Sequence, residues 1–355
     1  MARVYSSLKF MRYPEHLNAL EQREVVAPVH IRIKPNNHCN HSCWYCAYRF
    51  DDLQLGEDID LKEQIPREKM MEIVDDIVEL GVKAVTFSGG GEPLIYKPLV
   101  EAIERLAAGG VQVASLTNGS NLKGKVAEAF ARHGTWVRVS VDGWDDASYS
   151  KARRIKDGSF TRLLENMAAF SALKSSCALG VSFIVGKDNH EHVYEACQTF
   201  KQVGAQHVKV SAVVVGNDAH TNNTYHAEIK EKVQAQIRQA QATLSEPGFE
   251  ILNHYHDVDG RFDKEYTICP YLMFLTVIGA DCTVYTCQDK AYTESGILGS
   301  IKDRRFKDFW HSEENRQKLF ALNPSVSCGH HCVTHTKNLA LMEYLSLDPK
   351  HGAFV

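Results

Sequence analysis

The sequence predicts an α/β fold built on a parallel sheet, a partial (β/α)6 barrel. Six segments rich in β-branched and aromatic residues alternate with helix-like segments between residues 29 and 215. Right-handed crossovers between parallel strands wrap such a sheet into an open or partial barrel. Apolar residues make up 44% of the 355 residues and charged residues 24%, a globular balance that can bury a large core.

The predicted strands are short runs bounded by turn residues, and helices fall between them. The strands are expected at 29–33, 83–88, 111–116, 136–141, 179–185 and 207–213. Helices are expected at 66–80, 159–174 and 190–203, the first with Pro66 in its first turn. After a polar loop at 216–226, a further helix is expected at 226–244. In barrels of this kind the active site lies in the loops that leave the carboxyl ends of the strands.

Charge and hydropathy limit the class of protein. The formal net charge is only −4 and no block of Lys and Arg stands out, so no nucleic-acid partner is expected. No apolar run suggests a signal peptide or a membrane span, and a cytoplasmic protein is expected. Disulfides are rare in reducing cytosol, so most of the ten cysteines indicate metal or redox chemistry. Cys177 and Cys197 stand alone and are expected to be buried.

Cys39, Cys43 and Cys46 follow the first predicted strand with the spacing CxxxCxxC. Three thiolates on a tight loop suit a four-iron cluster with one iron left for an outside ligand. Zinc is the alternative, because His38 or His41 could supply a fourth ligand.

Polar residues follow the next predicted strands and would line the same rim of the barrel. Three glycines and Glu92 lie in "TFSGGGEP", where backbone amides could approach a ligand and the carboxylate could receive an ammonium group. The other candidates are Asn118, Ser140, Asp142, Arg153 and Arg154. Each of these segments taken alone is also typical of an ordinary turn.

The triplet with Tyr45 before its last cysteine, followed by the Gly-Gly-Glu element, resembles the radical S-adenosylmethionine (SAM) superfamily over about residues 29–215. The resemblance implies that Cys39, Cys43 and Cys46 bind a [4Fe–4S] cluster and that SAM chelates its fourth iron. It places the backbone at Tyr45 near adenine and the methionyl ammonium at Gly90, Gly91 and Glu92. Ser140 with Arg153 or Arg154 would contact the SAM carboxylate or ribose, Phe183–Val185 would pack on adenine, and Gly89, Asn118 and Asp142 complete the expected cofactor-binding set.

A second cysteine group lies near the C-terminus, at Cys269, Cys282, Cys287, Cys328 and Cys332. A zinc site is one interpretation, since His330, His331 and His335 are close in sequence. Beside the first motif, the region resembles the SPASM/twitch module, which implies one auxiliary [4Fe–4S] cluster with Cys269, Cys287, Cys328 and Cys332 as ligands. Cys282 stands where that pattern usually has glycine. It is either an inert thiol or a catalytic one that donates a hydrogen atom to a substrate radical.

The resemblance implies a domain plan: an N-terminal extension (1–28), a radical SAM partial barrel (29–215), a linker helix and strand (216–260), a small α+β twitch/SPASM-like domain (261–345) and a tail (346–355). Only 38 residues precede Cys39, which favours a small-molecule substrate over a peptide. Residues expected near that substrate are Lys209, Ser211, Asn217, Asp218, His254, His256 and Asp257.

The expected activity is reductive cleavage of SAM to a 5′-deoxyadenosyl radical, then removal of a hydrogen atom from a sugar, aminocyclitol or nucleotide. A net oxidation assisted by the auxiliary cluster is favoured. An electron donor such as flavodoxin or ferredoxin is implied. The alternatives are a peptide maturase, an epimerase, a decarboxylase and a zinc-stabilised binding or regulatory protein.

Overall fold

A single curved sheet of ten strands runs through the computed structural model, which describes residues 5–49, 56–255, 259–348, 350–351 and 354. The strand order is β10-β9-β8-β1-β2-β3-β4-β5-β6-β7. The strands are β1 (His30–Ile33), β2 (Ala84–Phe87), β3 (Gln112–Thr117), β4 (Gly134–Ser140), β5 (Ala178–Val185), β6 (His207–Ala212), β7 (Glu250–His254), β8 (Leu275–Ile278), β9 (Thr283–Tyr285) and β10 (Ile297–Ser300). Strands β1 to β7 pair in parallel, which confirms the predicted partial barrel.

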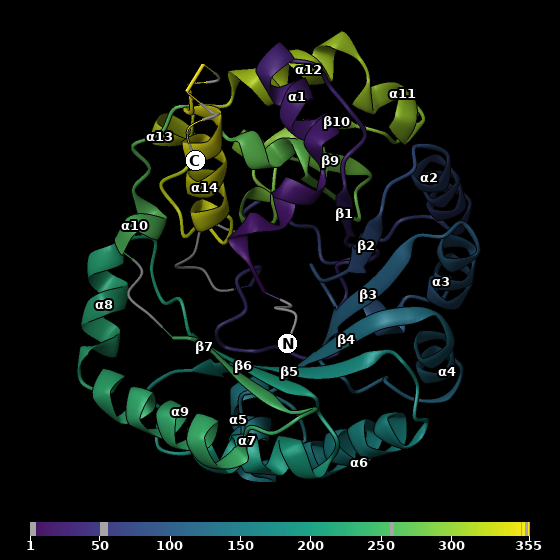
Figure 1. Cartoon of the computed structure of the whole chain (residues 1–355). Coiled ribbons are helices and arrows are strands. Elements are labelled where there is room, and N and C mark those ends of the chain that lie inside the picture. The colour runs from purple at the N-terminus through teal and green to yellow at the C-terminus, as the bar shows by residue number, and fades with distance from the viewer. Residues whose placement is uncertain (1–4, 50–55, 256–258, 349, 352–353, 355) are drawn as a thin grey trace.

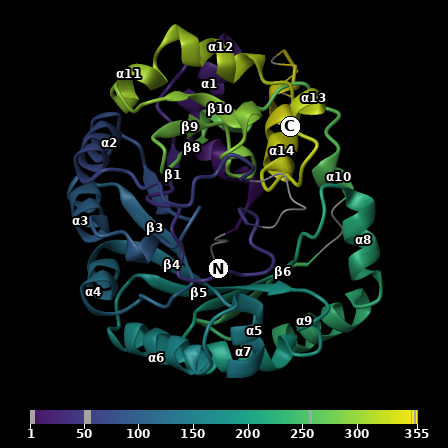
Figure 2. The ribbon, with the colours of Figure 1, turned by 180° about the vertical axis from the view of Figure 1, so that it is seen from behind.

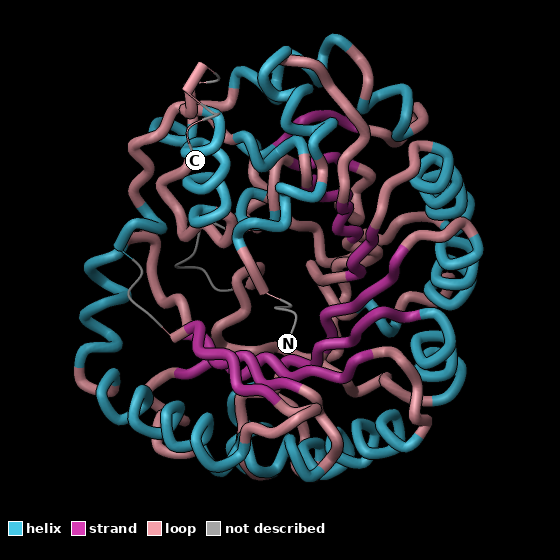
Figure 3. Tube along the Cα trace, in the orientation of Figure 1, coloured by secondary structure: helices cyan, strands magenta, loops and turns pink. Residues whose placement is uncertain are grey.

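Helices cover the outer face of this sheet (Figures 1 and 3). Those of the barrel are α2 (Arg67–Glu79), α3 (Leu99–Ala108), α4 (Gly124–His133), α5 (Asp146–Arg153), α6 (Ser159–Ala172), α7 (Val193–Gln202), α8 (Ala219–Ala227) and α9 (Lys230–Leu244). The later ones are α10 (Asp259–Phe262), α11 (Phe306–Trp310), α12 (Glu313–Ala321), α13 (Pro324–Ser327) and α14 (His335–Leu345). The prediction of a polar loop at 216–226 was wrong. Asp218 caps α8 by accepting a hydrogen bond from the Thr221 amide, and Asn222 and His226 are buried on its inner side.

Strand alternation separates the helix-facing side chains from those that face the barrel interior. In β4, Val137 and Val139 are fully buried. The residues that alternate with them, Arg138 and Ser140, remain partly accessible. In β5 the ring of Phe183 lies 6.1 Å from that of Phe200 on α7. Successive side chains of a strand point to opposite faces, so the apolar set builds the core under the helices and the polar set lines the interior.

The C-terminal region continues the barrel sheet. Strand β8 pairs in parallel with β1, residue His30 opposite Leu275 and Ile33 opposite Ile278. The N-terminal segment, a 3-10 helix (Ser7–Arg12) and α1 (Pro14–Gln22), packs on this junction, where the His16 ring stacks 5.2 Å from Phe274. Viewed from behind, α1 lies beside α12 at the β8–β10 end of the molecule (Figure 2). Strand β8 and the N-terminal segment, which are distant in sequence, thus both support β1.

Of the described helices, none has the length and apolar character needed to traverse a bilayer. His256 and Asp257, expected near the substrate, lie outside the described residues.

Candidate active site

The loop after β1 brings three partly buried thiols together at the carboxyl end of the sheet. The loop is held to α5, because the amides of Ser42 and Trp44 donate to the carbonyls of Arg153 and Ala152 at 3.1 and 3.3 Å. Burial, followed by the charges of Glu92 and Cys43, raises the pKa of Cys39 to about 11. Burial and Cys43 also raise the pKa of Cys46. Without a cation the thiols of Cys39 and Cys46 therefore stay protonated, and a bound metal centre would supply the charge that makes them thiolates.

The first loop offers three sulfur ligands. Among the described residues, the side chains whose ligand atoms all lie within 4.8 Å of one another are Cys287, Asp289 and His330, so the three thiols of the first loop do not form so close a group. His41, the buried alternative zinc ligand, has its ring 6.1 Å from that of Tyr149. His38 is exposed. The donor set therefore fits an iron–sulfur cluster held by Cys39, Cys43 and Cys46.

The glycines after β2 are required because two loops meet there. A Cβ atom on Gly91 would lie 1.9 Å from the carbonyl oxygen of His38, and one on Gly90 would lie 2.1 Å from Oδ1 of Asn37. The Gly91 amide donates to the Asn36 carbonyl at 3.0 Å, and the Glu92 amide donates to the His38 carbonyl at 2.9 Å. The glycine-rich loop is thereby fixed against the residues that lead into Cys39.

Glu92 is buried and holds the neighbouring loops. Its carboxylate accepts hydrogen bonds from Thr117 Oγ1 at 2.5 Å and from the amides of Leu94 and Asn118 at 2.9 and 2.7 Å. Asn118 in turn donates to Asn40 Oδ1 at 2.9 Å, and its Nδ2 lies 3.9 Å from Cys39 Sγ. Burial raises the pKa of Glu92 despite these donors. Glu92 thus fixes the side chain of Asn118 beside Cys39. The contact of Glu92 with the methionyl ammonium stays a prediction.

Asp142 joins the end of β4 to the cysteine loop. Its Oδ2 accepts hydrogen bonds from Tyr45 Oη and from Arg153, and its Oδ1 accepts one from the Ile184 amide at 3.0 Å. Arg153 also places its Nη1 3.4 Å from Cys43 Sγ. The guanidinium is 4% exposed, so it supplies a buried positive charge directly at a predicted cluster ligand.

Three sequence-predicted site residues lie elsewhere. Arg154 is exposed at the end of α5, so of the two arginines it is Arg153 that reaches the site. Phe183 and Val185 are fully buried on the helix-facing side of β5, and their side chains therefore do not face the site. Ile184, between them in the same predicted segment, points to the opposite face of the strand, because a strand turns successive side chains to alternate sides. Ser140 lies on that inward face of β4, opposite Ser182.

A second thiol group forms in the C-terminal region from Cys269, Cys287, Cys328 and Cys332. Burial and then Asp289 raise the pKa of Cys287, and the other three cysteines of the group raise it further. Asn338 Nδ2 donates to Cys269 Sγ at 3.3 Å. These soft donors also fit an iron–sulfur cluster.

Buried Lys264 holds the loop that contains Cys328. Its ammonium group donates to the carbonyls of Phe262 and Cys328 at 2.7 and 2.6 Å and to that of His330.

Cys282 lies apart from these four cysteines. It occupies the turn between β8 and β9 with φ +60°, a conformation that favours glycine. Burial raises its pKa to about 11, and the charges that act on it are those of Lys69, Asp281, Lys302 and Glu63. This placement favours a packing role in the turn over hydrogen donation to a substrate.

A buried polar bridge joins the two thiol groups, and sequence reasoning missed it. Lys34, just after β1, donates to Gly89 O and Tyr48 Oη at 2.6 Å each and to Gln288 Oε1 at 3.3 Å. Gly89 belongs to the glycine-rich loop, and Gln288 follows Cys287 in sequence. A basic residue directly after the alternating run "HIRI" is the signal that could have indicated this bridge.

Comparisons with known proteins agree with this geometry. Sequence models of the radical SAM superfamily and of an iron–sulfur cluster-binding domain, SPASM, match residues 33–200 and 269–333. An S-adenosylmethionine-dependent nucleotide dehydratase from Lacinutrix mariniflava is 30% identical over 120 residues, 34% of this chain and 25% of that protein. A GTP 3′,8-cyclase from Pseudomonas putida is 25% identical over 172 residues, 46% of this chain and 48% of that protein. The chain thus spans less than half the length of these relatives.

Solved structures show the same fold. Streptococcus suis SuiB bound to the precursor peptide SuiA superposes with a TM-score of 0.63 at 14% identity, covering 93% of this chain and 77% of SuiB. The anSMEcpe structure with bound AdoMet gives 0.59 at 15% identity, covering 89% and 95%. Residues 33–200 thus form a radical SAM domain and residues 269–333 a SPASM-type iron–sulfur domain, and the cofactors of the chain are SAM, the [4Fe–4S] cluster that binds SAM and an auxiliary iron–sulfur cluster.

Proposed function

We propose that this chain is an oxidoreductase that removes a hydrogen atom from a small molecule of the sugar, aminocyclitol or nucleotide type. Two curated relatives are named for nucleotide chemistry, a nucleotide dehydratase and a GTP cyclase, which supports a substrate of this size. When bound, the first cluster and SAM supply the 5′-deoxyadenosyl radical, and the auxiliary cluster supplies an acceptor for the second electron.

The chain's own residues hold and orient these groups. Cys39, Cys43 and Cys46 would hold the first cluster, and the buried guanidinium of Arg153 offsets negative charge at Cys43. Asp142 keeps that guanidinium in place and also receives Tyr45, so the adenine-side loop and the charge are fixed together. Fixed charges of this kind need no rearrangement when the substrate reacts.

The observation that carries a net oxidation is the Lys34 bridge. Lys34 contacts the glycine-rich loop on one side and Gln288, the neighbour of a proposed auxiliary ligand, on the other. One buried side chain thus contacts both proposed cluster sites. This contact supports an auxiliary centre that takes an electron from a substrate radical formed in the barrel.

The test is anaerobic turnover of reconstituted protein with SAM, a strong reductant and panels of sugars, aminocyclitols and nucleotides. We expect 5′-deoxyadenosine and a product two electrons poorer than its substrate. Cys43→Ala should abolish 5′-deoxyadenosine formation, whereas Cys197→Ala, a buried cysteine on α7, should not. SAM cleavage by Cys43→Ala would contradict the site assignment, and a product at the same oxidation level would contradict the oxidation.

Zinc is the competing occupant, favoured by the close approach of Cys287, Asp289 and His330. Elemental analysis separates the two, since two full clusters require about eight irons per chain. A colourless protein containing mostly zinc would favour a binding or regulatory role.

A further inference from the structure

Three basic side chains face the interior of the barrel from three different strands. Arg32 on β1, Arg138 on β4 and Lys209 on β6 each stand between two aliphatic residues that are fully buried under the helices. Alternation along a strand therefore turns all three toward the interior, the side of the sheet away from the helices in Figure 3.

These cations lack acidic partners. Within the part of the chain that the structure describes, none of the three forms an ion pair, and Arg32 and Arg138 donate only to neutral groups: Gln288 Oε1 at 3.3 Å and Tyr5 Oη at 2.9 Å. The Nε atoms of both arginines are buried without a hydrogen-bond partner among the described residues. A buried donor left unpaired in this way destabilises the protein unless water or a ligand satisfies it.

The electrostatics of Lys209 agree with an excess of positive charge. Burial lowers its pKa to about 7, followed by the charges of Arg138, Arg32, Arg261 on α10 and Lys337 on α14. Every charged group in this set is a cation. Asp289, the carboxylate that acts most strongly on the pKa of Arg32, already accepts a hydrogen bond from the Val333 amide at 2.7 Å.

We propose that Arg32, Arg138 and Lys209 bind an anionic group of the substrate, and that this group is a phosphate or diphosphate on a small molecule. The inference rests on the proposed function, because it places the substrate in the barrel beside the two cluster sites. Arginine forks match phosphate oxygens with paired hydrogen bonds, and three cations from three strands exceed what one carboxylate would balance.

The test is isothermal titration calorimetry with inorganic pyrophosphate as the probe, on anaerobic reconstituted protein saturated with SAM. Saturation with SAM keeps the probe from the cofactor's own carboxylate contacts. We expect Arg138→Gln and Lys209→Met each to weaken binding about tenfold or more, because a charge-assisted hydrogen bond contributes about 1.5–3 kcal/mol.

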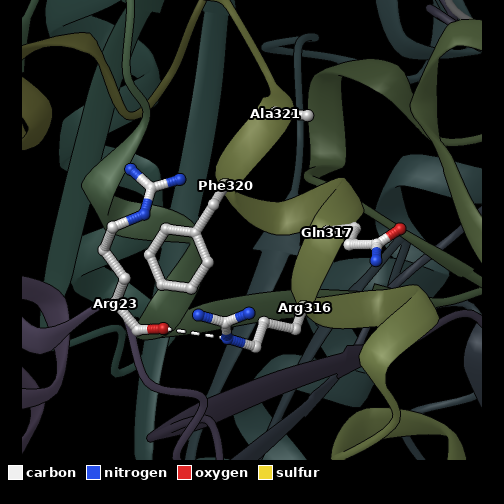
Figure 4. A pocket seen from close by; sticks show the side chains of 5 residues that line it. All are labelled: Arg23, Arg316, Gln317, Phe320 and Ala321. Carbon is white, nitrogen blue, oxygen red and sulfur yellow. Dashed lines mark hydrogen bonds between the residues drawn. The ribbon is translucent and has the colours of Figure 1, made fainter.

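The matched control is the exposed basic pocket at α12 (Figure 4). There Arg23 lies 4.8 Å from the centre of the Phe320 ring, and Arg316 lines the same opening of about 320 Å³ while pairing with Glu313 at 3.3 Å. Arg316→Gln should leave pyrophosphate binding unchanged. Loss of binding in Arg316→Gln with retention in Arg138→Gln, or no binding by the wild type, would overturn the proposal.

Proton uptake on pyrophosphate binding gives a second measurement, and it can be made on the wild-type protein itself. At pH 8 most Lys209 side chains should be neutral, and a bound anion should raise the pKa of Lys209 and protonate it. Pyrophosphate also exchanges protons on binding, equally in both proteins, so titrations in two buffers of different ionisation enthalpy should reveal more proton uptake in the wild type than in Lys209→Met. Equal uptake in both would contradict the assignment.

The two proposals fail separately. Reductant-driven SAM cleavage is measured on the same wild-type preparation without substrate. If SAM is cleaved and pyrophosphate does not bind, only the phosphate site is wrong. If SAM is not cleaved, the proposed function fails whatever the titration shows.

Discussion

Arg153 and Arg154 are adjacent in sequence and differ in what surrounds them. Arg153 is 4% exposed and pairs with Asp142, which is equally buried, whereas Arg154 lies exposed at the end of α5. A buried ion pair that loses one partner leaves an uncompensated charge, which typically costs about 3–5 kcal/mol.

We therefore expect Arg153→Gln to lower the free energy of unfolding by about 3–5 kcal/mol, measured by urea denaturation under anaerobic conditions. Arg154→Gln, the control, should change it by no more than about 0.5 kcal/mol. Equal effects of the two substitutions would show that the Asp142 pair does not stabilise the fold.

The glycine-rich loop acts at the scale of an element, because it fixes the cysteine loop by direct backbone contact. Gly91→Ala would force a Cβ atom into the His38 carbonyl, 1.9 Å away, and should displace the segment that leads to Cys39. We expect loss of about half the iron and of SAM cleavage.

Gly329→Ala is the control for that substitution, because nothing lies within 4 Å of a Cβ atom there. This glycine lies beside Cys328, so it also tests whether any glycine near a cysteine is sensitive. Full iron content in Gly91→Ala would mean that the loop contact is not needed for cluster binding.

The loop between α13 and α14 should control the auxiliary cluster alone. Cys328→Ala removes one of the four proposed ligands, and we expect it to lose about half the iron while the first cluster keeps its spectrum. Cys282→Ala should keep all the iron, since Cys282 lies in a separate turn. Iron analysis and electron paramagnetic resonance measure both, and full iron in Cys328→Ala would remove it from the ligand set.

At the scale of the whole molecule, most of the barrel could be predicted from the sequence. Strands β1 to β6 lie where β-branched runs are bounded by turns, and Cys177 and Cys197 are buried as expected. Helix α8 could not be predicted, because its sequence is polar and its stability comes from the Asp218 cap and from burial of Asn222. Local pattern does not report such tertiary contacts.

The site could be predicted where its chemistry follows from residue type and spacing. It could be predicted less well where it depends on the face of a strand to which a side chain points. The cysteine motifs could be found from spacing alone. That Ile184 rather than Phe183 points to the barrel interior depends on which face of β5 is covered by helices. The Lys34 bridge depends on β8 joining β1, a pairing between segments about 240 residues apart that no local pattern contains.

Stability should fall in mild acid because histidines are buried in their neutral form. Burial, followed by the charges of Arg32, Lys337 and Lys9, lowers the pKa of His30 to about 3. The unfolded state therefore binds more protons than the folded state below about pH 6.5, and stability is lost as the pH falls toward 3. Wild type should lose about 1–2 kcal/mol more than His30→Gln between pH 7 and pH 5 in urea titrations. Parallel losses would exclude His30 as a source.

The most direct test is the Mössbauer spectrum of protein reconstituted with 57Fe, recorded with and without SAM. The account predicts two [4Fe–4S] clusters and a changed signal from about one iron in eight when SAM is added, because one iron of the first cluster lacks a protein ligand. Absence of such clusters after reconstitution, or a spectrum that SAM leaves unchanged, would contradict it.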